Sequence, residues 1–167
     1  MIQPTIIDIE ASGFGKGSYP IEIGFHRPDG MAYCTLIQPE AEWTHWDASA
    51  EQVHGIRREL LFEKGRPVRA VCLDLNEKLR GQTIYCDAWA YDYVWLSKLF
   101  DAADLMPIFQ LRDIRELLGE CEQTLWHATR AAVELRLQLR RHRASSDARM
   151  LFETLLEARK HCAPDWS

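Results

Sequence analysis

The sequence predicts a single α/β domain with a mixed sheet, because strand-like segments crowd its first part and alternate with helical segments afterwards. Ile6–Ile9, Ile21–Phe25 and Ala32–Ile37 are rich in β-branched and aromatic residues and are separated by turn residues, as strands are. A helical spacing of apolar residues over 68–79 then precedes a further short apolar segment. With 167 residues, the chain is long enough for one well-buried domain and short for two. We therefore expect residues 1–167 to form one domain.

The later elements are expected to alternate between helix and strand. A polar loop begins at Pro39 and holds Trp43 and Trp46, to which the sequence assigns no role. Pro67 then suits the first turn of the helix predicted over 68–79. Beyond this helix we expect a strand at Thr83–Cys86, a helix from about Tyr91 to Ala102, a strand at Pro107–Leu111, a helix at Glu122–Arg141 and a last helix at Asp147–Cys162 capped by Ser146.

Composition and charge exclude several classes of protein. Hydrophobic residues make up 47% of the chain and charged residues 27%, an ordinary globular composition that argues against disorder. The formal net charge of −5 argues against a protein that coats duplex DNA without specificity, because such binders usually carry a basic surplus. The amino terminus lacks a basic segment followed by an apolar one, and no stretch reaches membrane-spanning length. We expect a soluble cytoplasmic protein with no membrane partner.

The cysteines predict a reducing environment. The five cysteines are scattered, odd in number and without a C-x-x-C pair, so we expect reduced thiols that serve mostly as small core residues. A zinc site can also be drawn from cysteines and histidines late in the chain, but their spacing matches no known zinc finger. The residues concerned are Cys121, His127, His161 and Cys162.

Asp8 and Glu10 are the first candidate site residues. They lie two apart on a predicted strand, so their side chains point to the same face of the sheet. Neighbouring carboxylates repel each other, and an enzyme keeps such a pair mainly when a divalent cation lies between them. The turn at 12–14 then takes the chain away from the strand end, where active sites of open α/β sheets gather. Taken alone, a solvated strand end is the simpler interpretation of this pair.

Two further acidic residues and a histidine extend the group. Asp92 stands where a predicted strand passes into a helix, and Asp147 stands at the start of the last helix, shortly after His142. Each aspartate alone could be a first-turn acid favoured by the helix dipole, and His142 alone could be a basic residue at a helix end. The residue types and their order along the chain, however, match a known pattern.

Together these segments resemble the DEDDh 3′→5′ exonucleases of the ribonuclease H-like fold. The first motif of that family, D-x-E followed by a small hydroxyl residue, Gly and a large apolar residue, is matched by residues 8–14, and its third motif, H-x-A-x-x-D-A, by residues 142–148. Its second motif places an aspartate after an aromatic residue, as at 91–92. Weaker likenesses at 21–24 and 54–56 follow in the right order. The resemblance implies a ribonuclease H-like mixed five-stranded sheet flanked by helices.

The resemblance also implies a site for two divalent cations, Mg²⁺ or Mn²⁺, which hard oxygen ligands favour over zinc. Two such ions about 4 Å apart can activate a water molecule and stabilise the leaving oxygen of a phosphodiester. Asp8 would bridge the ions. Glu10 and Asp147 would hold one of them, and Asp92 would help to hold the other. His142 would accept a proton from the attacking water, a task that suits imidazole because it ordinarily titrates near neutral pH.

Six further residues are predicted to contact substrate, and three of them have a structural alternative. The large apolar residue of the first motif would pack against the terminal bases, although it could equally be a core anchor. The family often has an asparagine shortly before the second-motif aspartate, and Asp87 is the nearest candidate here, so one substrate contact departs from the pattern. The tryptophan that follows and the histidine of the H-G-I segment could contact substrate or serve in packing. The six residues are Ser12, Gly13, Phe14, His54, Asp87 and Trp89.

The resulting hypothesis is a metal-dependent exonuclease that releases nucleoside 5′-monophosphates from the 3′ end of a single-stranded nucleic acid. RNA and DNA both remain candidates, because the choice depends on whether the pocket accepts the 2′-hydroxyl. Several relatives in the family are homodimers, so a homodimer is a further expectation. The alternative is a non-catalytic nucleic-acid- or partner-binding module that retains the exonuclease fold, although the presence of all five site residues argues against it. Three arginines could also contact phosphates, but a solvated helix face is the simpler interpretation of Arg136, Arg140 and Arg143.

Overall fold

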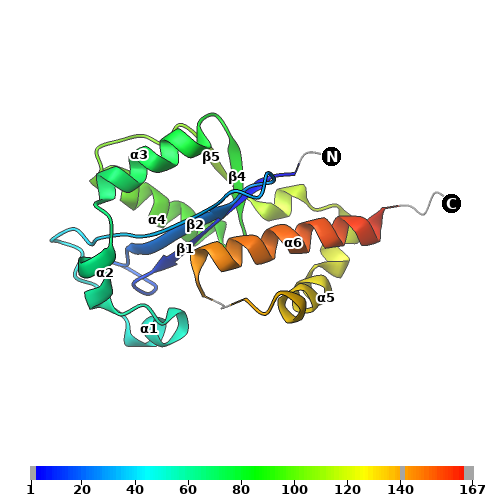
Figure 1. Ribbon diagram of the computed structural model, residues 1–167, viewed down its shortest axis with the longest axis horizontal. Coiled ribbons are helices and arrows are strands. Elements are labelled where there is room, and N and C mark those ends of the chain that lie inside the picture. The colour runs from blue at the N-terminus through cyan, green and yellow to red at the C-terminus, as the bar shows by residue number, and fades with distance from the viewer. Residues whose placement is uncertain (1–2, 140–141, 164–167) are drawn as a thin grey trace.

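Five strands form one mixed sheet in the part of the chain that the computed structural model describes, residues 3–139 and 142–163 (Figure 1). The strands are β1 (Thr5–Ala11), β2 (Pro20–His26), β3 (Ala32–Leu36), β4 (Thr83–Cys86) and β5 (Gln110–Asp113). Their order in the sheet is β3-β2-β1-β4-β5, with β1 antiparallel to β2 and parallel to β4. β1 therefore lies at the centre of the sheet. The predicted mixed five-stranded sheet flanked by helices is confirmed.

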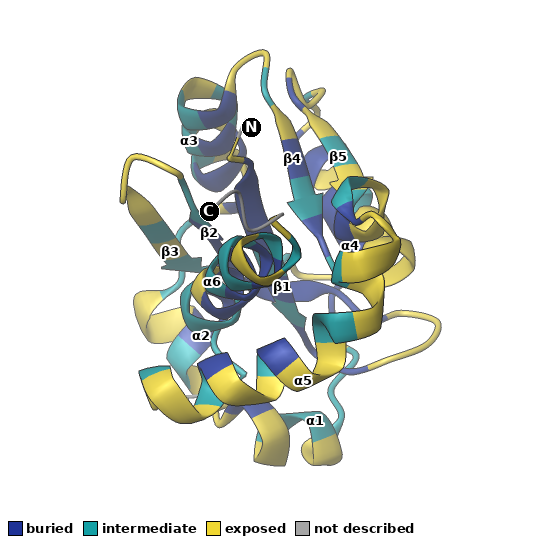
Figure 2. Cartoon of the chain, turned by 90° about the vertical axis from the view of Figure 1, so that its right-hand side faces the viewer, coloured by how far each residue is buried: buried dark blue, intermediate teal, exposed yellow. Residues whose placement is uncertain are grey.

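Helices cover both faces of this sheet. They are α1 (Ala48–His54), α2 (Arg58–Lys64), α3 (Val68–Leu79), α4 (Trp89–Ala102), α5 (Glu120–Leu137) and α6 (Ala144–Cys162), with a short 3-10 turn, η1 (Ile114–Leu117), before α5. α6 packs along β1 and β2, and α5 packs against α6 from outside, so most of α5 is exposed (Figure 2). α3 and α4 pack on the opposite face (Figure 1). Among the described residues, no helix is both long and apolar enough to cross a membrane.

The alternation of side chains along β1 decides where its carboxylates lie. Ile7 and Ile9 are buried in the larger hydrophobic cluster with residues of α3 and α4, whereas Ile6 is buried with residues of α6. Successive side chains of a strand point to opposite faces. Asp8 and Glu10 therefore share the α6 side of the sheet with Ile6. The isoleucines suit this strand because β-branched side chains pack well on a pleated surface that is buried on both faces.

The segment between β3 and α3 is more helical than predicted, since α1 and α2 occupy it. The signals for α1 are local: Asp47 accepts a hydrogen bond from the backbone N–H of Ser49, and Gly55 ends the helix in the left-handed conformation with a φ of 67°. Aspartate, serine and glycine are also the usual turn residues, so they predict a loop as readily as a short helix. Trp43, which had no predicted role, stacks on Tyr19 in the core with ring centroids 5.3 Å apart.

The predicted cap of the last helix is wrong. α6 begins at Ala144 rather than Asp147, so Ser146 lies inside its first turn. Arg143 occupies the N-cap position and makes no side-chain cap bond. A serine cap is not needed here, because the carboxylate of Glu22 accepts the backbone N–H of Ala144 at 2.9 Å.

The bounds of two other predicted elements differ from those in the structure. The last strand is Gln110–Asp113 instead of Pro107–Leu111, because these residues pair in register with the whole of β4. The long helix predicted at Glu122–Arg141 is α5, which begins two residues earlier and ends at Leu137. Residues 140–141 of that prediction lie outside the described residues.

The prediction of five reduced thiols is wrong for two of them. Cys121 and Cys162 form a disulfide, with their Cα atoms 5.9 Å apart. They are 41 positions apart in sequence and meet because α5 and α6 pack side by side. The disulfide also rules out the zinc site drawn from these cysteines, since a zinc ligand must be a thiolate. Cys72 and Cys86 are free and buried as predicted, whereas Cys34 is free and exposed.

Candidate active site

A hollow of about 500 Å³ opens where β1 passes into the turn at 12–14. β1, this turn, α1, α4 and the segment that leads into α6 all contribute to its wall. The hollow brings together the five residues that the sequence motifs predicted as catalytic. They are Asp8, Glu10, Asp92, His142 and Asp147.

The topology of the sheet explains why the four carboxylates meet. β4 runs parallel to β1, so the chain that leaves β4 enters α4 at the end of the sheet where β1 also ends. Asp92 lies in the first turn of α4, and Asp147 lies in the first turn of α6, which packs on β1 and β2. In open α/β sheets, ligand sites gather where strands end and helices begin.

Crowding and burial raise the pKa values of these carboxylates. Burial raises the pKa of Asp8 well above its usual value, and repulsion by neighbouring carboxylates, first that of Asp92, adds to the rise. Burial, and then repulsion by Asp147, raise the pKa of Glu10 to about 7. Burial is also the main cause that raises the pKa of Asp92 to about 8. Such shifts are typical of functional carboxylates that the fold holds together against their mutual repulsion.

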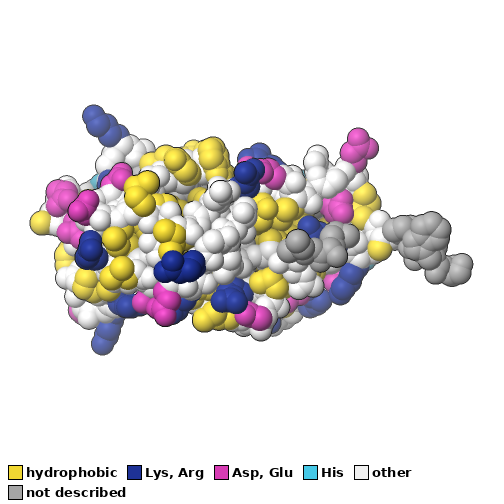
Figure 3. All heavy atoms as spheres, turned by 90° about the horizontal axis from the view of Figure 1, so that it is seen from above, with side chains coloured by type: hydrophobic (Ala, Val, Ile, Leu, Met, Phe, Trp, Pro, Cys, Tyr) yellow, Lys and Arg dark blue, Asp and Glu magenta, His cyan; other side chains and the backbone are white. Residues whose placement is uncertain are grey.

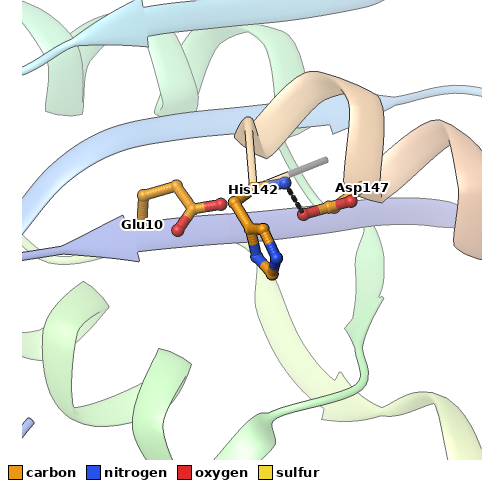
Figure 4. Close-up of side chains that lie close together, drawn as sticks. All are labelled: Glu10, His142 and Asp147. Carbon is orange, nitrogen blue, oxygen red and sulfur yellow. Dashed lines mark hydrogen bonds between the residues drawn. The ribbon is translucent and has the colours of Figure 1, made fainter. Parts of the chain in front are cut away.

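His142 is held in an unusual backbone conformation beside Asp147. Its φ of 55° lies in the left-handed region, which residues with a Cβ seldom adopt. Its backbone N–H donates a 2.9 Å hydrogen bond to Oδ2 of Asp147. Ligand atoms of Glu10, His142 and Asp147 lie within 4.8 Å of one another, and the His142 ring lies between the two carboxylates (Figure 4). The backbone conformation and the hydrogen bond together direct the imidazole toward the carboxylates.

The donor atoms of the hollow fit divalent cations. Carboxylate oxygens are the ligands that Mg²⁺ and Mn²⁺ prefer. Asp92 is only 1% exposed, yet its Oδ2 has no hydrogen-bond partner among the described residues. A cation held by Asp8 and Asp92 would supply that partner and would offset the repulsion between the two. Glu10 and Asp147 offer further carboxylate oxygens beside His142.

The raised pKa of Glu10 predicts that the metal-free protein loses stability as the pH rises. A glutamate in the unfolded chain releases its proton near pH 4.5, whereas folded Glu10 releases it near pH 7. Between these values the folded state binds more protons than the unfolded state, so the free energy of unfolding falls with rising pH. Glu10 alone should account for a loss on the order of 3 kcal/mol once the pH exceeds both values.

A comparison of the wild type with Glu10→Gln in EDTA isolates this effect. Burial lowers the pKa values of His26 and His54, so these groups make the free energy of unfolding rise with pH. The pH dependence of the wild type alone therefore does not show the contribution of Glu10. Chemical denaturation should show the variant gaining stability relative to the wild type as the pH rises from about 5 to about 8. A difference that stays constant or shrinks over this range would show that Glu10 titrates normally.

Three aromatic side chains form one wall of the hollow. Phe14 is 66% exposed, and its ring lies edge-on to Tyr91 with the centroids 5.1 Å apart. Tyr91 in turn stacks on Trp95 at 5.8 Å. Mutually supported rings of this kind offer flat surfaces on which nucleic-acid bases can stack. Trp95 was not predicted, although its place four residues after Tyr91 puts both on one face of a helix.

Gly13 and Ser12 shape the turn after β1. Gly13 has a φ of 141°, and a Cβ there would lie 2.6 Å from the Cβ of Asp47, so a larger residue would not fit. Ser12 is fully buried, with its N–H donating to the carbonyl of Tyr19 and its hydroxyl accepting the N–H of Tyr19. The hydroxyl also bonds to Nδ1 of His45 at 3.0 Å. These bonds direct the polar groups of Ser12 into the turn, and its contact with substrate stays a prediction.

His54 lines the hollow and carries one buried ring N–H. Its Nδ1 accepts the backbone N–H of Ile56 at 3.0 Å, so in the neutral ring the proton lies on Nε2. Burial lowers the pKa of His54, which favours this neutral form. Nε2 has no hydrogen-bond partner within the described part of the chain, and the side chain lines the hollow. The predicted contact of His54 with substrate therefore has a donor that could make it.

Asp87 and Trp89 lie outside the hollow. Asp87 forms a 2.9 Å ion pair with Arg130 of α5. Trp89 donates from Nε1 to the carbonyl of Leu111 at 3.3 Å and packs beside Tyr93 in a separate depression between α4 and β5. Both side chains thus have structural partners outside the hollow, although the charge of Asp87 contributes to the raised pKa values of Asp8 and Asp92. Their predicted roles as substrate contacts gain no support from this placement.

α1 supplies wall residues that the sequence pattern did not indicate. Asp47, Ser49, Ala50 and Val53 line the hollow beside His54. The segment reads as a loop in the sequence, and only the H-G-I residues at its end gave a signal. Val53 is 55% exposed, an open position for an apolar side chain at the rim of a polar site.

The fold is shared with solved exonucleases. Neither a protein-family model nor a curated protein sequence matches the chain. Exonuclease I from Methylocaldum szegediense is similar with a TM-score of 0.70 and 14% identity, over 96% of this chain and 41% of that chain. E. coli exonuclease I in a zinc-bound complex with single-stranded DNA gives a TM-score of 0.71 and 14% identity, over 98% and 42% of the two chains. The complex of E. coli exonuclease I with a dA16 oligonucleotide gives 0.69 and 14%, over 96% and 42%.

The chain therefore shares the ribonuclease H-like architecture of these exonucleases, as its motifs predicted. It spans less than half the length of the matched chains. The likeness establishes the fold, and the function of this chain has to be inferred from the residues in its own hollow. The homodimer and the cytoplasmic location stay predictions.

Proposed function

We propose that this chain is a metal-dependent 3′→5′ exonuclease of the DEDDh type, which releases nucleoside 5′-monophosphates from single-stranded nucleic acid. The observation that carries the proposal is the convergence of four carboxylates and a histidine on one hollow. They come from β1, α4 and the start of α6, which are far apart in the sequence. The complexes of E. coli exonuclease I with single-stranded DNA support the choice of substrate class.

The residues of the hollow would divide the chemistry between them. The carboxylates would hold two divalent cations, Mg²⁺ or Mn²⁺, with Asp8 as the candidate shared ligand. When bound, such cations lower the pKa of a water molecule and stabilise a leaving oxygen. His142 would take the proton of the attacking water, since its ring lies between Glu10 and Asp147. His54 would donate its buried Nε2–H to the substrate.

The shape of the hollow favours one free strand end. A volume of about 500 Å³ is of the size that holds a single small ligand, such as a terminal nucleotide. The wall of Phe14, Tyr91 and Trp95 would accept a base by stacking, which tolerates every base. A paired complementary strand would have to be displaced before the terminal nucleotide could enter. We therefore expect weak base preference and little action on blunt duplex ends.

The surface charge supports local rather than long-range recognition. Basic, acidic and hydrophobic side chains are interspersed on the face shown in Figure 3. The chain as a whole carries a formal net charge of −5. Non-specific attraction to a long polyanion comes mainly from clustered basic residues. Substrate affinity should therefore come mainly from the hollow and its aromatic wall.

Degradation of a 5′-labelled single-stranded oligonucleotide tests the proposal. In Mn²⁺ the wild type should shorten the strand stepwise from its 3′ end, and EDTA should stop the reaction. Matched RNA and DNA strands would show which sugar the hollow accepts. Cuts within a circular single strand, or full activity on a 3′-phosphorylated end, would contradict the proposal. Binding without any cleavage in Mn²⁺ would favour a non-catalytic module.

Phe14→Ala should weaken the use of substrate without abolishing the chemistry. The side chain is exposed at the mouth of the hollow, and stacking of one base on an aromatic ring is worth about 1–3 kcal/mol. We expect kcat/KM on a single-stranded oligonucleotide to fall by a factor of about 5 to 150, mostly through KM. Mn²⁺ should still raise the melting temperature of this variant, because a bound ligand stabilises the folded state and Phe14 offers no ligand atom.

Phe62→Ala is the matched control, since Phe62 is also an exposed phenylalanine but lies on α2, outside the hollow. Its kcat/KM should equal that of the wild type. Equal losses in the two variants would mean that the effect of Phe14→Ala is not specific to the site. An unchanged kcat/KM in Phe14→Ala would remove the aromatic wall from the account of substrate binding.

A further inference from the structure

Glu22 is a fully buried carboxylate that the proposed reaction does not use. It lies on β2, opposite Glu10 in the register of the sheet, and its side chain is 1% exposed. Oε1 accepts Nε and Nη2 of Arg143 at 3.0 and 2.5 Å. Oε2 accepts the same Nε at 3.0 Å and the backbone N–H of Ala144 at 2.9 Å. Both oxygens are therefore occupied by donors from one short segment of the chain.

The same segment lies in direct contact with β2 at Gly24. A Cβ on Gly24 would lie 2.5 Å from the backbone nitrogen of Ser145 and 2.8 Å from the carbonyl carbon of Ala144. Glycine at this position lets the backbone at the start of α6 touch the backbone of the strand. Glu22 and Gly24 are two apart on β2 and so face the same side of the sheet. β2 thus holds the start of α6 in two ways. The two backbones touch at Gly24, and the carboxylate of Glu22 binds Arg143 and the N–H of Ala144, contacts that together form a clamp.

The residues that Glu22 holds are next to the candidate general base in the chain. Arg143 and Ala144 directly follow His142 in the chain. The left-handed φ of His142 is a conformation that persists only where the surrounding structure holds it. On one side it is held by the hydrogen bond from its N–H to Asp147, and on the other by the clamped residues that follow it. A shift of the clamped segment would therefore turn the imidazole away from the carboxylates.

From these contacts we propose that Glu22 is a positioning residue for the nuclease reaction: it clamps Arg143 and the N–H of Ala144 and thereby fixes the ring of His142. The inference rests on the proposed function. Glu22 would act through His142, because its oxygens are already occupied and leave none free for substrate or metal. A buried ion pair contributes little net stability, since the desolvation of both charges offsets much of their attraction. Its larger effect here is to select one placement of the helix start.

A double-mutant cycle between Glu22 and His142 tests the proposal. Glu22→Ala removes the clamp, whereas Glu22→Gln keeps an oxygen acceptor for the N–H of Ala144. At saturating Mn²⁺, Glu22→Ala should lower kcat by about 10- to 100-fold, the range typical of residues that orient a catalytic group. Glu22→Gln should recover part of this loss. KM and the affinity for Mn²⁺ should change by less than about twofold, because three of the four carboxylates and the aromatic wall lie on β1, the turn after it and α4, which the clamp does not hold.

The decisive measurement is made in the His142→Ala background. With the ring gone, Glu22→Ala should lower the remaining rate by less than about twofold, since residues that act as a unit do not contribute additively. Asp74→Asn is the matched control, because Asp74 also holds an arginine, Arg66, in a partly buried ion pair but lies on α3. Its kcat should stay within about twofold of the wild type.

The outcomes separate a positioning role from a structural one. A loss of equal size in both backgrounds, or one that falls on KM or on Mn²⁺ affinity, would overturn the inference. If Glu22→Ala does not fold, Glu22→Gln carries the same cycle, and the NMR signals of the His142 ring should change in Glu22→Gln but not in Asp74→Asn. A wild type that does not cleave in Mn²⁺ overturns the proposed function and this inference with it. An active wild type with an additive cycle overturns the inference alone.

Discussion

Asp8→Ala and Asp147→Ala are each expected to abolish cleavage in Mg²⁺ or Mn²⁺ while leaving the fold intact. Asp8 has the most crowded position, since repulsion from several other carboxylates adds to burial in raising its pKa. Loss of one such ligand should lower kcat/KM by a factor of about 10³ or more, because metal ions contribute several kcal/mol to the transition state. Without metal, Asp8→Ala should be as stable as the wild type or slightly more stable, because one repelling charge is gone.

Melting temperature separates loss of the metal site from loss of the fold. Mn²⁺ should raise the melting temperature of the wild type, since a ligand that binds only the folded state stabilises it by mass action. Asp8→Ala should cancel most of this rise. Asp101→Ala is the control: it removes an exposed acid near the other end of α4 and should keep both activity and the rise. Full cleavage by Asp8→Ala, or an undiminished rise, would place the metal at some other site.

The carboxylate cluster could be predicted from the sequence because each of its parts is local. Asp8 and Glu10 share a face by the alternation of a strand, and the structure places them on the α6 side. His142 and Asp147 are five positions apart and belong to one helix start, where a hydrogen bond joins them. The sheet then needs only a parallel β4 beside β1 to bring Asp92 to the same end.

The contacts that hold this cluster in place could not be predicted, because they join residues far apart in sequence. Glu22 and Arg143 are 121 positions apart, and a charged residue in a strand or at a helix start is usually solvated. The sequence accordingly favoured a solvated helix face for Arg143, and this interpretation is wrong. Arg136 does lie on the surface, where it pairs with Glu153, and Arg140 lies outside the described residues.

The fold was predicted best in elements whose hydrophobic pattern extends over their whole length, and least well in short helices. β1, β2 and α3 carry clear alternation or helical spacing, and the structure has them within a residue or two of the predicted bounds. α1 and α2 span about two turns each, and much of their length is exposed, so no apolar stripe marked them. Their absence from the prediction also hid the α1 wall of the hollow. The disulfide was missed for a related reason, since it depends on how α5 and α6 pack.

His142→Ala is expected to slow cleavage by a factor of about 10² to 10⁴ at saturating Mn²⁺, because a general base contributes on this scale. The ring lies between Glu10 and Asp147, where it could take a proton from a water molecule bound beside these carboxylates. The pH profile of the variant should differ from that of the wild type, because the group that accepts the proton of the attacking water is gone. The profiles have to be recorded at saturating metal, because the pKa of Glu10, about 7, falls in the same range.

A role of His142 as a metal ligand is the competing explanation, and metal binding decides between the two. Its ring atoms lie within 4.8 Å of carboxylate oxygens of Glu10 and Asp147, close enough for the three to share a cation. If His142 is the general base, the rise in melting temperature with Mn²⁺ should survive in His142→Ala although the rate is lost. His127→Ala, which removes an exposed histidine of α5, should keep the full rate and the wild-type pH profile. Loss of the Mn²⁺ effect in His142→Ala would identify His142 as a ligand, and unchanged turnover with an unchanged pH profile would place the general base elsewhere.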